Sequence, residues 1–306
     1  MKHGLNAVNN RLVRAIIAVV VIAAIALISV GAFGLSWQRV FSLFGFYADR
    51  TEGVSVSFID VGKADCSLIT CGESVALIDA GEDAQADKVV PYLERYGIEK
   101  IDVFVATHPD KDHIGGAAAV IERFEVKRCL QPSISTDILP DTSEYKKMTE
   151  LLNSKNIFCD YAEAGDKFSV GELKFSALSP AFQYDTVNNN SVVLRLDCFG
   201  KSFLFTGDAE EAVENNLADI YGEGLKSDVL KVSHHGSKNA TSNRFLQYVS
   251  PQYGVISVGE NTNNLPSRVC VDRLNGNGVT VYRTDLQGTV TINVSKSGEL
   301  TVHTEK

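Results

Sequence analysis

An apolar run that ends in a dense polar cluster limits most strongly how this chain can fold. Residues 101–106 are mainly apolar, which predicts a buried strand. Two histidines and two aspartates follow within six residues, from His108 to His113. Pro109 disfavours a helical conformation at His108, so the cluster is predicted to lie on a loop at the carboxyl end of this strand. In open sheets, ligands bind at that end of the strands.

This loop has two interpretations. A surface loop often carries acids and a lysine because they keep the protein soluble. Two histidines beside those acids are harder to explain in that way, since imidazole and carboxylate groups are both common metal ligands. We therefore predict a metal site at this loop.

Two later apolar runs end in the same kinds of residue. Residues 202–206 lead to Asp208, and residues 229–232 lead to His234 and His235. Asp208 alone would be weak support for a metal site, because it also suits the N-cap of a helix predicted at 209–217. Four of the six histidines nevertheless fall in two loops that follow predicted strands, and we assign no role to His3 and His303 near the termini.

The pattern His-x-Asp-x-Asp-His, from His108 to His113 and followed by Gly-Gly, resembles the metal-binding signature of the metallo-β-lactamase superfamily. That superfamily more often has histidine where Asp110 stands. The aspartate variant is similar to the extracellular hydrolase domain of the ComEC competence family. Three further stretches resemble this family: 60–65 (DVGKAD, with Lys63 and Ala64 in place of Gln and Gly), 234–237 (HHGS) and 282–288 (YRTDLQG). Relatives often carry His-Pro where this chain has Leu265-Pro266.

The resemblance covers residues 53 to about 294 and implies a four-layer αββα sandwich of the mixed α/β (α+β) class. It also implies two divalent metal ions. One would bind His108, Asp110 and a bridging Asp208. The other would bind Asp112, His113, Asp208 and one of His234 and His235, with Asp112 alternatively orienting the attacking water. A carboxylate oxygen at position 110 is a harder ligand, in the hard–soft sense, than an imidazole nitrogen. It therefore favours manganese without excluding zinc.

Further residues receive roles from the same resemblance. Lys63 either contacts a substrate phosphate or is a solvated hairpin lysine. Asn190 lies in a stretch similar to the family's Asn-Ser-x-Val-Leu, although an asparagine-rich turn explains it equally well. Ser237 and Lys238 are candidates for phosphate contacts. The predicted catalytic residues are Asp112, Asp208, Lys63, Asn190 and Ser237, and the predicted orienting carboxylates are Asp60, Asp65 and Asp79.

The N-terminal region predicts attachment to a membrane. Residues 15–38 contain no charged residue and are long enough to span a bilayer. Lys2, Arg11 and Arg14 precede this segment, and no acid occurs before Asp49, which places the N-terminus in the cytoplasm. We predict a cytoplasmic segment at 1–14, an anchor at 15–38, a linker at 39–52 and an extracellular hydrolase domain at 53–306. A cleaved signal peptide is the competing interpretation.

The net charge of the chain limits the range of expected substrates. The whole chain carries −9 and residues 1–48 contribute +4, which leaves −13 for the remainder. A protein that binds a long polyanion through its backbone usually needs a basic surface. The resemblance implies phosphodiester hydrolysis by a metal-activated hydroxide, on DNA or a cell-wall polymer, and the negative charge favours the small or short substrates of that range. The alternatives are hydrolysis of a non-phosphate ester or amide, and a DNA-handling protein without catalysis.

The six cysteines show no metal-type C-x-x-C spacing. Cys66 and Cys198 lie in apolar strand patterns, which favours buried free thiols over disulfides.

Overall fold

The structure, a computed structural model, describes residues 52–306. The predicted cytoplasmic segment, the anchor at 15–38 and nearly all of the linker lie outside the described residues. Within 52–306, no helix has both the length and the apolar character needed to cross a membrane.

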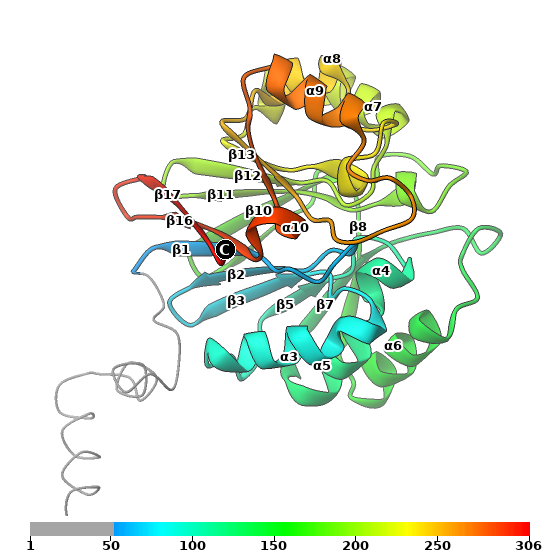
Figure 1. The fold of residues 1–306 in the computed structure, drawn as a ribbon. Coiled ribbons are helices and arrows are strands. Elements are labelled where there is room, and N and C mark those ends of the chain that lie inside the picture. The colour runs from blue at the N-terminus through cyan, green and yellow to red at the C-terminus, as the bar shows by residue number, and fades with distance from the viewer. Residues whose placement is uncertain (1–51) are drawn as a thin grey trace, which may run out of the picture. The chain divides into compact units, whose positions relative to one another are not determined.

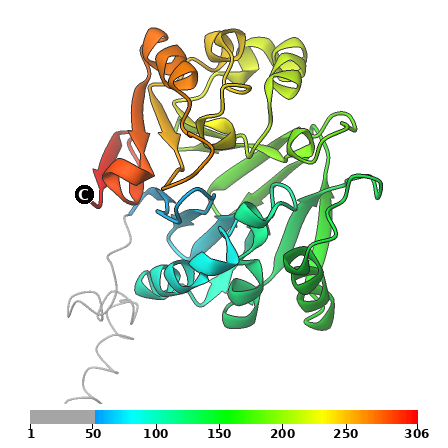
Figure 2. The same cartoon turned by 45° about the vertical axis from the view of Figure 1, so that its right-hand side comes forward.

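Two β-sheets pack face to face at the centre of the domain (Figures 1 and 2). The first sheet has eight strands and the second has seven. In sheet order, the first contains β17 (Leu300–Thr304), β16 (Val290–Val294), β1 (Val54–Phe58), β2 (Ser67–Cys71), β3 (Ser74–Ile78), β5 (Val103–Val105), β7 (Arg128–Pro132) and β8 (Phe158–Ala162). The second contains β15 (Thr280–Arg283), β14 (Tyr253–Ile256), β13 (Val229–Lys231), β12 (Lys201–Phe205), β11 (Val193–Cys198), β10 (Leu173–Ser179) and β9 (Lys167–Val170). A separate two-stranded sheet pairs β4 (Lys100–Ile101) with β6 (Glu125–Val126).

Helices cover the outer face of each sheet (Figure 1). The first sheet is covered by α3 (Ala86–Arg95), α5 (Ala117–Arg123) and α6 (Ser143–Ser154), with the short α4 (Lys111–Ile114) at its edge. The second is covered by α7 (Glu211–Tyr221), α8 (Asn243–Val249) and α9 (Arg268–Gly276). Another short helix, α10 (Thr284–Gln287), follows β15. The predicted αββα arrangement is confirmed.

Apolar clusters hold these layers together, and two of them share the strands of the second sheet. The larger one lies between the sheets and includes Val56 and Phe58 from β1 and Leu194 and Phe203 from the second sheet. The smaller one lies between the second sheet and its helices. All six cysteines are free thiols, and burial raises the pKa of the Cys198 thiol to about 12.

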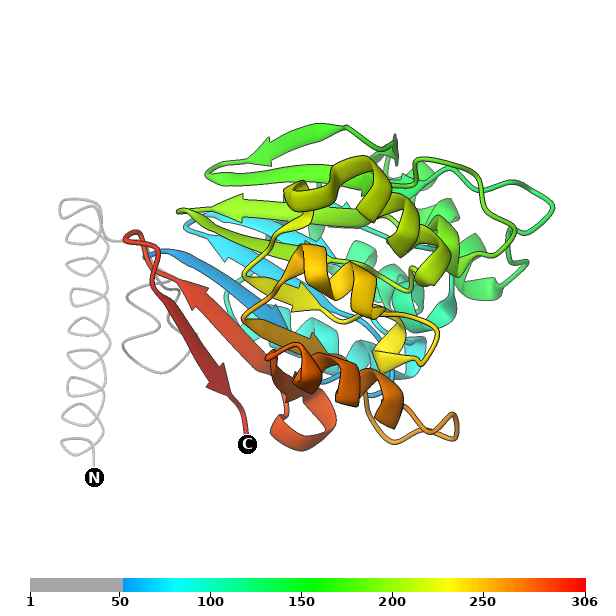
Figure 3. The ribbon, with the colours of Figure 1, turned by 90° about the horizontal axis from the view of Figure 1, so that it is seen from above.

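The first strand of the domain pairs with one of the last. In the first sheet, β1 lies between β2 and β16 and is antiparallel to both, with Val54 opposite Val294 and Phe58 opposite Val290. Figure 3 shows β1 and β16 side by side. The sheet is thus built from both ends of the described chain.

Parallel strands bring the polar loops to one edge of the domain. In the first sheet β3, β5, β7 and β8 are parallel, and in the second β12, β13, β14 and β15 are parallel. Asp79 follows β3, His108 follows β5, Asp208 follows β12, and His234 and His235 follow β13. Because the carboxyl ends of parallel strands share one edge, these side chains meet there.

A buried acid beneath the second helix layer makes the stability of the domain depend on pH. Glu214 of α7 is 1% exposed, and its carboxylate accepts hydrogen bonds from the backbone N–H groups of Thr241 and Ser242. Burial raises the pKa of Glu214 from its ordinary value of 4.5 to about 7. The folded state therefore binds this proton more tightly than the unfolded chain. The contribution is fully present below about pH 4.5 and is lost as the pH rises through about 7.

We expect Glu214 to lower the free energy of unfolding by about 2.5 kcal/mol between pH 5 and pH 8. Urea unfolding at several pH values measures the slope of the free energy of unfolding against pH. Glu214→Gln should flatten it, whereas Glu150→Gln, an exposed position on α6, should keep it. An equal slope in wild type and Glu214→Gln would contradict the assignment.

Candidate metal centre

The His108–His113 segment is clamped to the loop that follows β3. The backbone N–H of Ala80 donates to the carbonyl of His113 at 2.7 Å, and that of Gly116 donates to the carbonyl of Gly81 at 3.0 Å. A Cβ atom at Gly116 would lie 2.2 Å from the carbonyl oxygen of Ala80. The second glycine of the Gly-Gly pair is therefore needed for this close approach, which fixes where the segment's side chains point.

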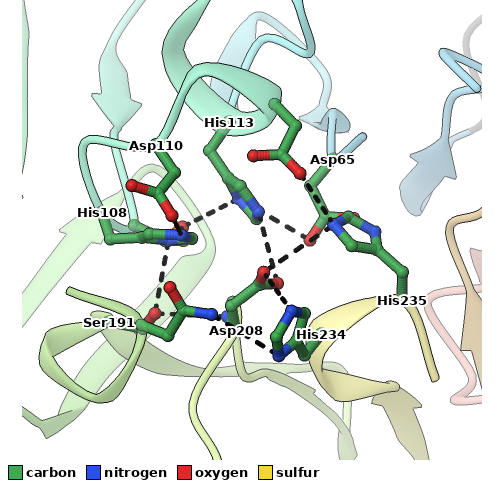
Figure 4. A network of polar contacts seen from close by, with 12 residues as sticks. Asp65, His108, Asp110, His113, Ser191, Asp208, His234 and His235 are labelled. Atoms are coloured by element: carbon green, nitrogen blue, oxygen red, sulfur yellow. Dashed lines mark hydrogen bonds and ion pairs between the residues drawn. The ribbon is translucent and has the colours of Figure 1, made fainter. Parts of the chain in front are cut away.

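Side chains from several loops converge at this edge (Figure 4). Asp208 lies at the centre. Its Oδ1 is 3.3 Å from Nε2 of His113, and its Oδ2 is 3.6 Å from Nε2 of His234 and 3.8 Å from Nε2 of His235. Asp112 lies beside His235, with 3.5 Å between Oδ2 and Nε2. Asp208 is not an N-cap, because the N-cap of α7 is Glu210.

Asp110 and His108 form the other end of the group. Oδ2 of Asp110 lies 3.6 Å from Nε2 of His108 (Figure 4). The His108 side chain is fully buried, whereas that of Asp110 is 38% exposed. The group therefore has one open side, where a substrate can approach.

Each buried histidine is held through Nδ1 and leaves Nε2 without a hydrogen bond. Nδ1 of His113 lies 2.8 Å from Oδ2 of Asp79, and Nδ1 of His235 lies 2.9 Å from the carbonyl oxygen of Ser257. Nδ1 of His108 lies 3.3 Å from Oγ of Ser191. Within residues 52–306, three imidazole nitrogens and two carboxylate oxygens of this region are buried without a hydrogen-bond partner: Nε2 of His108, His113 and His235, and Oδ1 of Asp208 and of Asp65.

Unpaired buried polar atoms cost about 1–3 kcal/mol each, so a group of them at one point needs an explanation. Histidines that bind a metal usually donate their other N–H to a carboxylate or carbonyl group, as His113 and His235 do here. Ligand atoms of His108, His113 and Asp208 lie within 4.8 Å of one another, and so do those of Asp112, His113 and His235. The residues present therefore fit divalent metal ions with nitrogen and oxygen ligands.

The electrostatics of the group favour a positive charge at its centre. Burial alone would lower the pKa of His113, but the carboxylates of Asp208 and Asp79 raise it well above its usual range. Burial would raise the pKa of Asp208, but His113 and His235 hold it well below its usual range. A cation at this point would thus be stabilised by buried carboxylates that stay ionised.

Three of the other predicted residues lie beside this group. Asp79 contacts His113 and also accepts hydrogen bonds from the backbone N–H and Oγ1 of Thr107, both at 2.8 Å. Asp65 forms a buried ion pair with Lys231, and its Oδ1 lies 3.7 Å from Nδ1 of His235. Lys63 contacts Asp112, with 2.5 Å between Nζ and Oδ2.

Three predicted residues are engaged elsewhere. The amide of Asn190 is buried and bonds to the backbone of Tyr184 and Thr186, so it fixes the preceding loop. Oγ of Ser237 accepts from the backbone N–H of Asn239 in a local turn. The carboxylate of Asp60 accepts from the backbone of Gly62 and lies 3.4 Å from Nζ of Lys306. Within residues 52–306, no side chain of these three makes a hydrogen bond or ion pair with the converging histidines and acids, although the backbone N–H of Ser237 donates to the carbonyl of His234 at 2.8 Å.

Sequence reasoning missed several residues that touch the group, among them Ser191, Thr107 and Glu210. Ser191 contacts His108 and accepts from the backbone N–H of Asp208 at 3.2 Å. Thr107 lies between Asp79 and the imidazoles. Oε1 of Glu210 lies 3.2 Å from Nδ1 of His234. Their nearness in the sequence could have identified them, because each of these three residues is next to, or two residues from, a predicted ligand or catalytic residue.

Asp79→Asn tests the orienting role of this carboxylate. An amide either donates to Nδ1 of His113 or offers it only a neutral acceptor, so the imidazole is held less firmly. Loss of such a partner typically costs 10–100-fold in metal affinity. We expect a loss of that size in metal titrations followed by calorimetry. Asp102→Asn, which changes a carboxylate beside Lys100 and Lys127, is the control, and equal affinities in both variants would contradict the role.

Comparison with known proteins gives three results. The family model of the metallo-beta-lactamase superfamily matches residues 59–260. ComE operon protein 3 of Bacillus subtilis (strain 168) is 30% identical over 277 residues, which cover 84% of this chain and 35% of that protein. Competence protein ComA of Neisseria gonorrhoeae is 30% identical over 291 residues, which cover 92% of this chain and 39% of that protein. The chain thus spans little more than a third of the length of these curated relatives.

A solved structure shares the fold. CmlA, a diiron beta-hydroxylase from Streptomyces venezuelae, matches with a TM-score of 0.53 and 14% sequence identity, over 86% of this chain and 58% of that one. At this identity the likeness concerns the arrangement of strands and helices alone.

Proposed function

Because this chain belongs to the metallo-beta-lactamase superfamily and resembles its ComEC-like members, we propose that it is a metal-dependent phosphodiesterase. One observation carries the proposal. Three buried imidazole nitrogens and a carboxylate oxygen lie together without hydrogen-bond partners. Such a donor set is costly in an apolar interior unless a cation completes it.

We assign the ligands to two divalent ions, zinc or manganese. His108, Asp110 and Asp208 would hold one ion, and Asp112, His113, His235 and Asp208 would hold the other. His235 is preferred over His234 because its side chain is fully buried and its Nδ1 is fixed on Ser257, while the side chain of His234 is 24% exposed. The first ion has fewer protein ligands, so we expect it to bind more weakly.

When bound, such ions supply a hydroxide nucleophile at neutral pH and polarise a phosphoryl oxygen. The protein's own residues position the substrate. The Lys63 side chain is 26% exposed at the edge of the group. Burial would lower its pKa, but the hydrogen bond to Asp112 and the charge of that carboxylate raise it. It therefore stays an ammonium group and offers a positive charge to a non-bridging phosphate oxygen.

His234 suits the protonation of the leaving oxygen. It is the more exposed histidine of the pair, and Glu210 holds its Nδ1. A carboxylate that orients an imidazole and stabilises its protonated form is a common arrangement in acid–base catalysis. Glu210 is accordingly a positioning residue for His234.

The relatives' names as competence proteins favour DNA as a substrate, and a cell-wall phosphodiester polymer is the other candidate. The acidity of residues 49–306 favours short or single-stranded substrates over long duplexes. The same relatives suggest a membrane context. From the uncharged run at 15–38 and the basic residues before it, we further propose that this run is the anchor and that the hydrolase domain lies outside the cell.

The experiment that tests this proposal measures metal content and turnover together. The purified full chain is analysed for bound metals and assayed on bis(p-nitrophenyl) phosphate with added manganese or zinc. Two metals with turnover would support the phosphodiesterase. Bound metal without turnover of any diester would point to an ester or amide substrate, and absence of both would favour a DNA-handling protein without catalysis.

A further inference from the structure

A cavity of about 200 Å³ lies beside the His108 loop. His108 and Pro109 form one wall, and the ends of β7 and β8, helix α6 and the loop at 133–139 form the others. His108 is also a candidate metal ligand, so the cavity and the metal centre share a residue. Three other cavities among the described residues share none with that centre.

Among the described residues that line this cavity, none has an acidic or basic side chain apart from the His108 imidazole. Two aromatic rings, Tyr145 and Tyr161, and the aliphatic side chains of Leu139 and Met148 provide apolar walls. A phosphate group would find no counter-charge there. An uncharged group with flat apolar faces would be well accommodated.

The cavity also contains a polar side chain that can hydrogen-bond to the edge of a bound ring. Gln131, at the end of β7, lines it. Its side-chain amide makes no hydrogen bond with another residue in the part of the chain that the structure describes. An amide both donates and accepts, which suits the mixed donor and acceptor edge of a heterocyclic ring.

Building on the proposed phosphodiesterase function, we infer that this cavity binds a nucleobase attached next to the scissile phosphate. A volume of 200 Å³ corresponds to about seven water molecules, which is room for one ring system and not for a chain. Stacking on aromatic side chains tolerates all bases. It also supplies affinity without a basic groove, in agreement with the acidic character of residues 49–306.

Tyr161 gives a clean test because its substitution should not disturb the fold. It is 60% exposed, and Phe158 on the same strand β8 is 66% exposed but does not line the cavity. Tyr161→Ala removes a cavity wall, and Phe158→Ala is the matched control. Thr136→Trp, at an exposed lining position, fills the cavity instead.

The binding experiment compares thymidine 5′-phosphate with 2-deoxyribose 5-phosphate, by calorimetry on the manganese-loaded full chain. We expect the base to tighten binding about 10-fold. Tyr161→Ala and Thr136→Trp should each reduce this preference to about 2-fold or less, and Phe158→Ala should keep it. Equal binding of the two ligands by wild type, no binding of either, or an unchanged preference in Tyr161→Ala and Thr136→Trp overturns the inference.

A turnover experiment separates this inference from the proposed function. Dithymidine monophosphate is compared with its analogue that lacks one base. Hydrolysis of both at the same kcat/KM would keep the phosphodiesterase and overturn the nucleobase site. Base-dependent binding that Tyr161→Ala abolishes, without hydrolysis of any diester, would keep the site and remove the phosphodiesterase.

Discussion

Replacing Asp208 by asparagine is expected to lower metal-dependent hydrolysis by about 1000-fold while the fold stays intact. Asp208 contacts His113, His234 and His235 and is buried at the centre of the group. Its carboxylate is the proposed ligand of both ions, so an amide weakens both sites together. Loss of a group that only orients a ligand costs 10–100-fold, and loss of a shared ligand should exceed that.

The measurement is kcat/KM on bis(p-nitrophenyl) phosphate with manganese, together with metal content and circular dichroism. Asp219→Asn is the matched control, because Asp219 is a 64% exposed carboxylate paired with Arg244 on the same helix layer. It should keep full activity. Wild-type turnover in Asp208→Asn would refute the two-metal proposal.

Replacing Lys231 by methionine should destabilise the domain by about 4 kcal/mol. Lys231 is 3% exposed and pairs with Asp65, whose side chain is 5% exposed, and its Nζ also donates to the carbonyl of Val232 at 3.0 Å. This ion pair joins the second sheet to the β1–β2 connection of the first. Methionine fills a similar volume but leaves the Asp65 carboxylate buried without its cation, which typically costs 3–5 kcal/mol.

Urea unfolding of the full chain measures this loss of stability. Two further variants test whether the unpaired Asp65 charge causes it. Lys201→Met removes a half-buried lysine that lies 3.2 Å from Asp228, the residue just before the neighbouring strand β13, and should cost no more than about 1 kcal/mol. Adding Asp65→Asn to Lys231→Met removes the unpaired charge and should recover about half of the loss. A cost below 1 kcal/mol for Lys231→Met itself would show that Asp65 is satisfied in another way.

The sequence was sufficient to place the strands expected at 101–106, 202–206 and 229–232 and the helix expected at 209–217, but not their limits. The strand expected at 101–106 is confined to Val103–Val105, because Ile101 belongs to β4 and Asp102 bonds to the backbone N–H of Val75. The helix expected at 209–217 begins at Glu211 and runs to Tyr221. Local hydrophobic patterns predict elements, whereas these limits depend on contacts with neighbouring strands.

The site was predictable to the extent that it follows strand ends. His108, Asp208 and His235 come directly after apolar runs, and parallel pairing brings them together. The role of the three asparagines at 188–190 was ambiguous in the sequence. They form a short 3-10 turn, and the conformation of that turn decides which residue faces the histidines. In that turn Asn190 points back to its own loop, while the next residue, Ser191, reaches His108.

The pairing of β1 with β16 has a consequence for synthesis of the protein. The hydrogen bonds of Val54 to Phe58 on that side come from Val290 to Val294, more than 230 residues later. The first sheet therefore keeps an open edge at β1 until residues 290–294 are in place. Contacts of such long sequence separation slow folding, because the loop must close before they form. A chaperone that shields the open edge of β1 until β16 pairs with it would consequently raise the yield of folded protein.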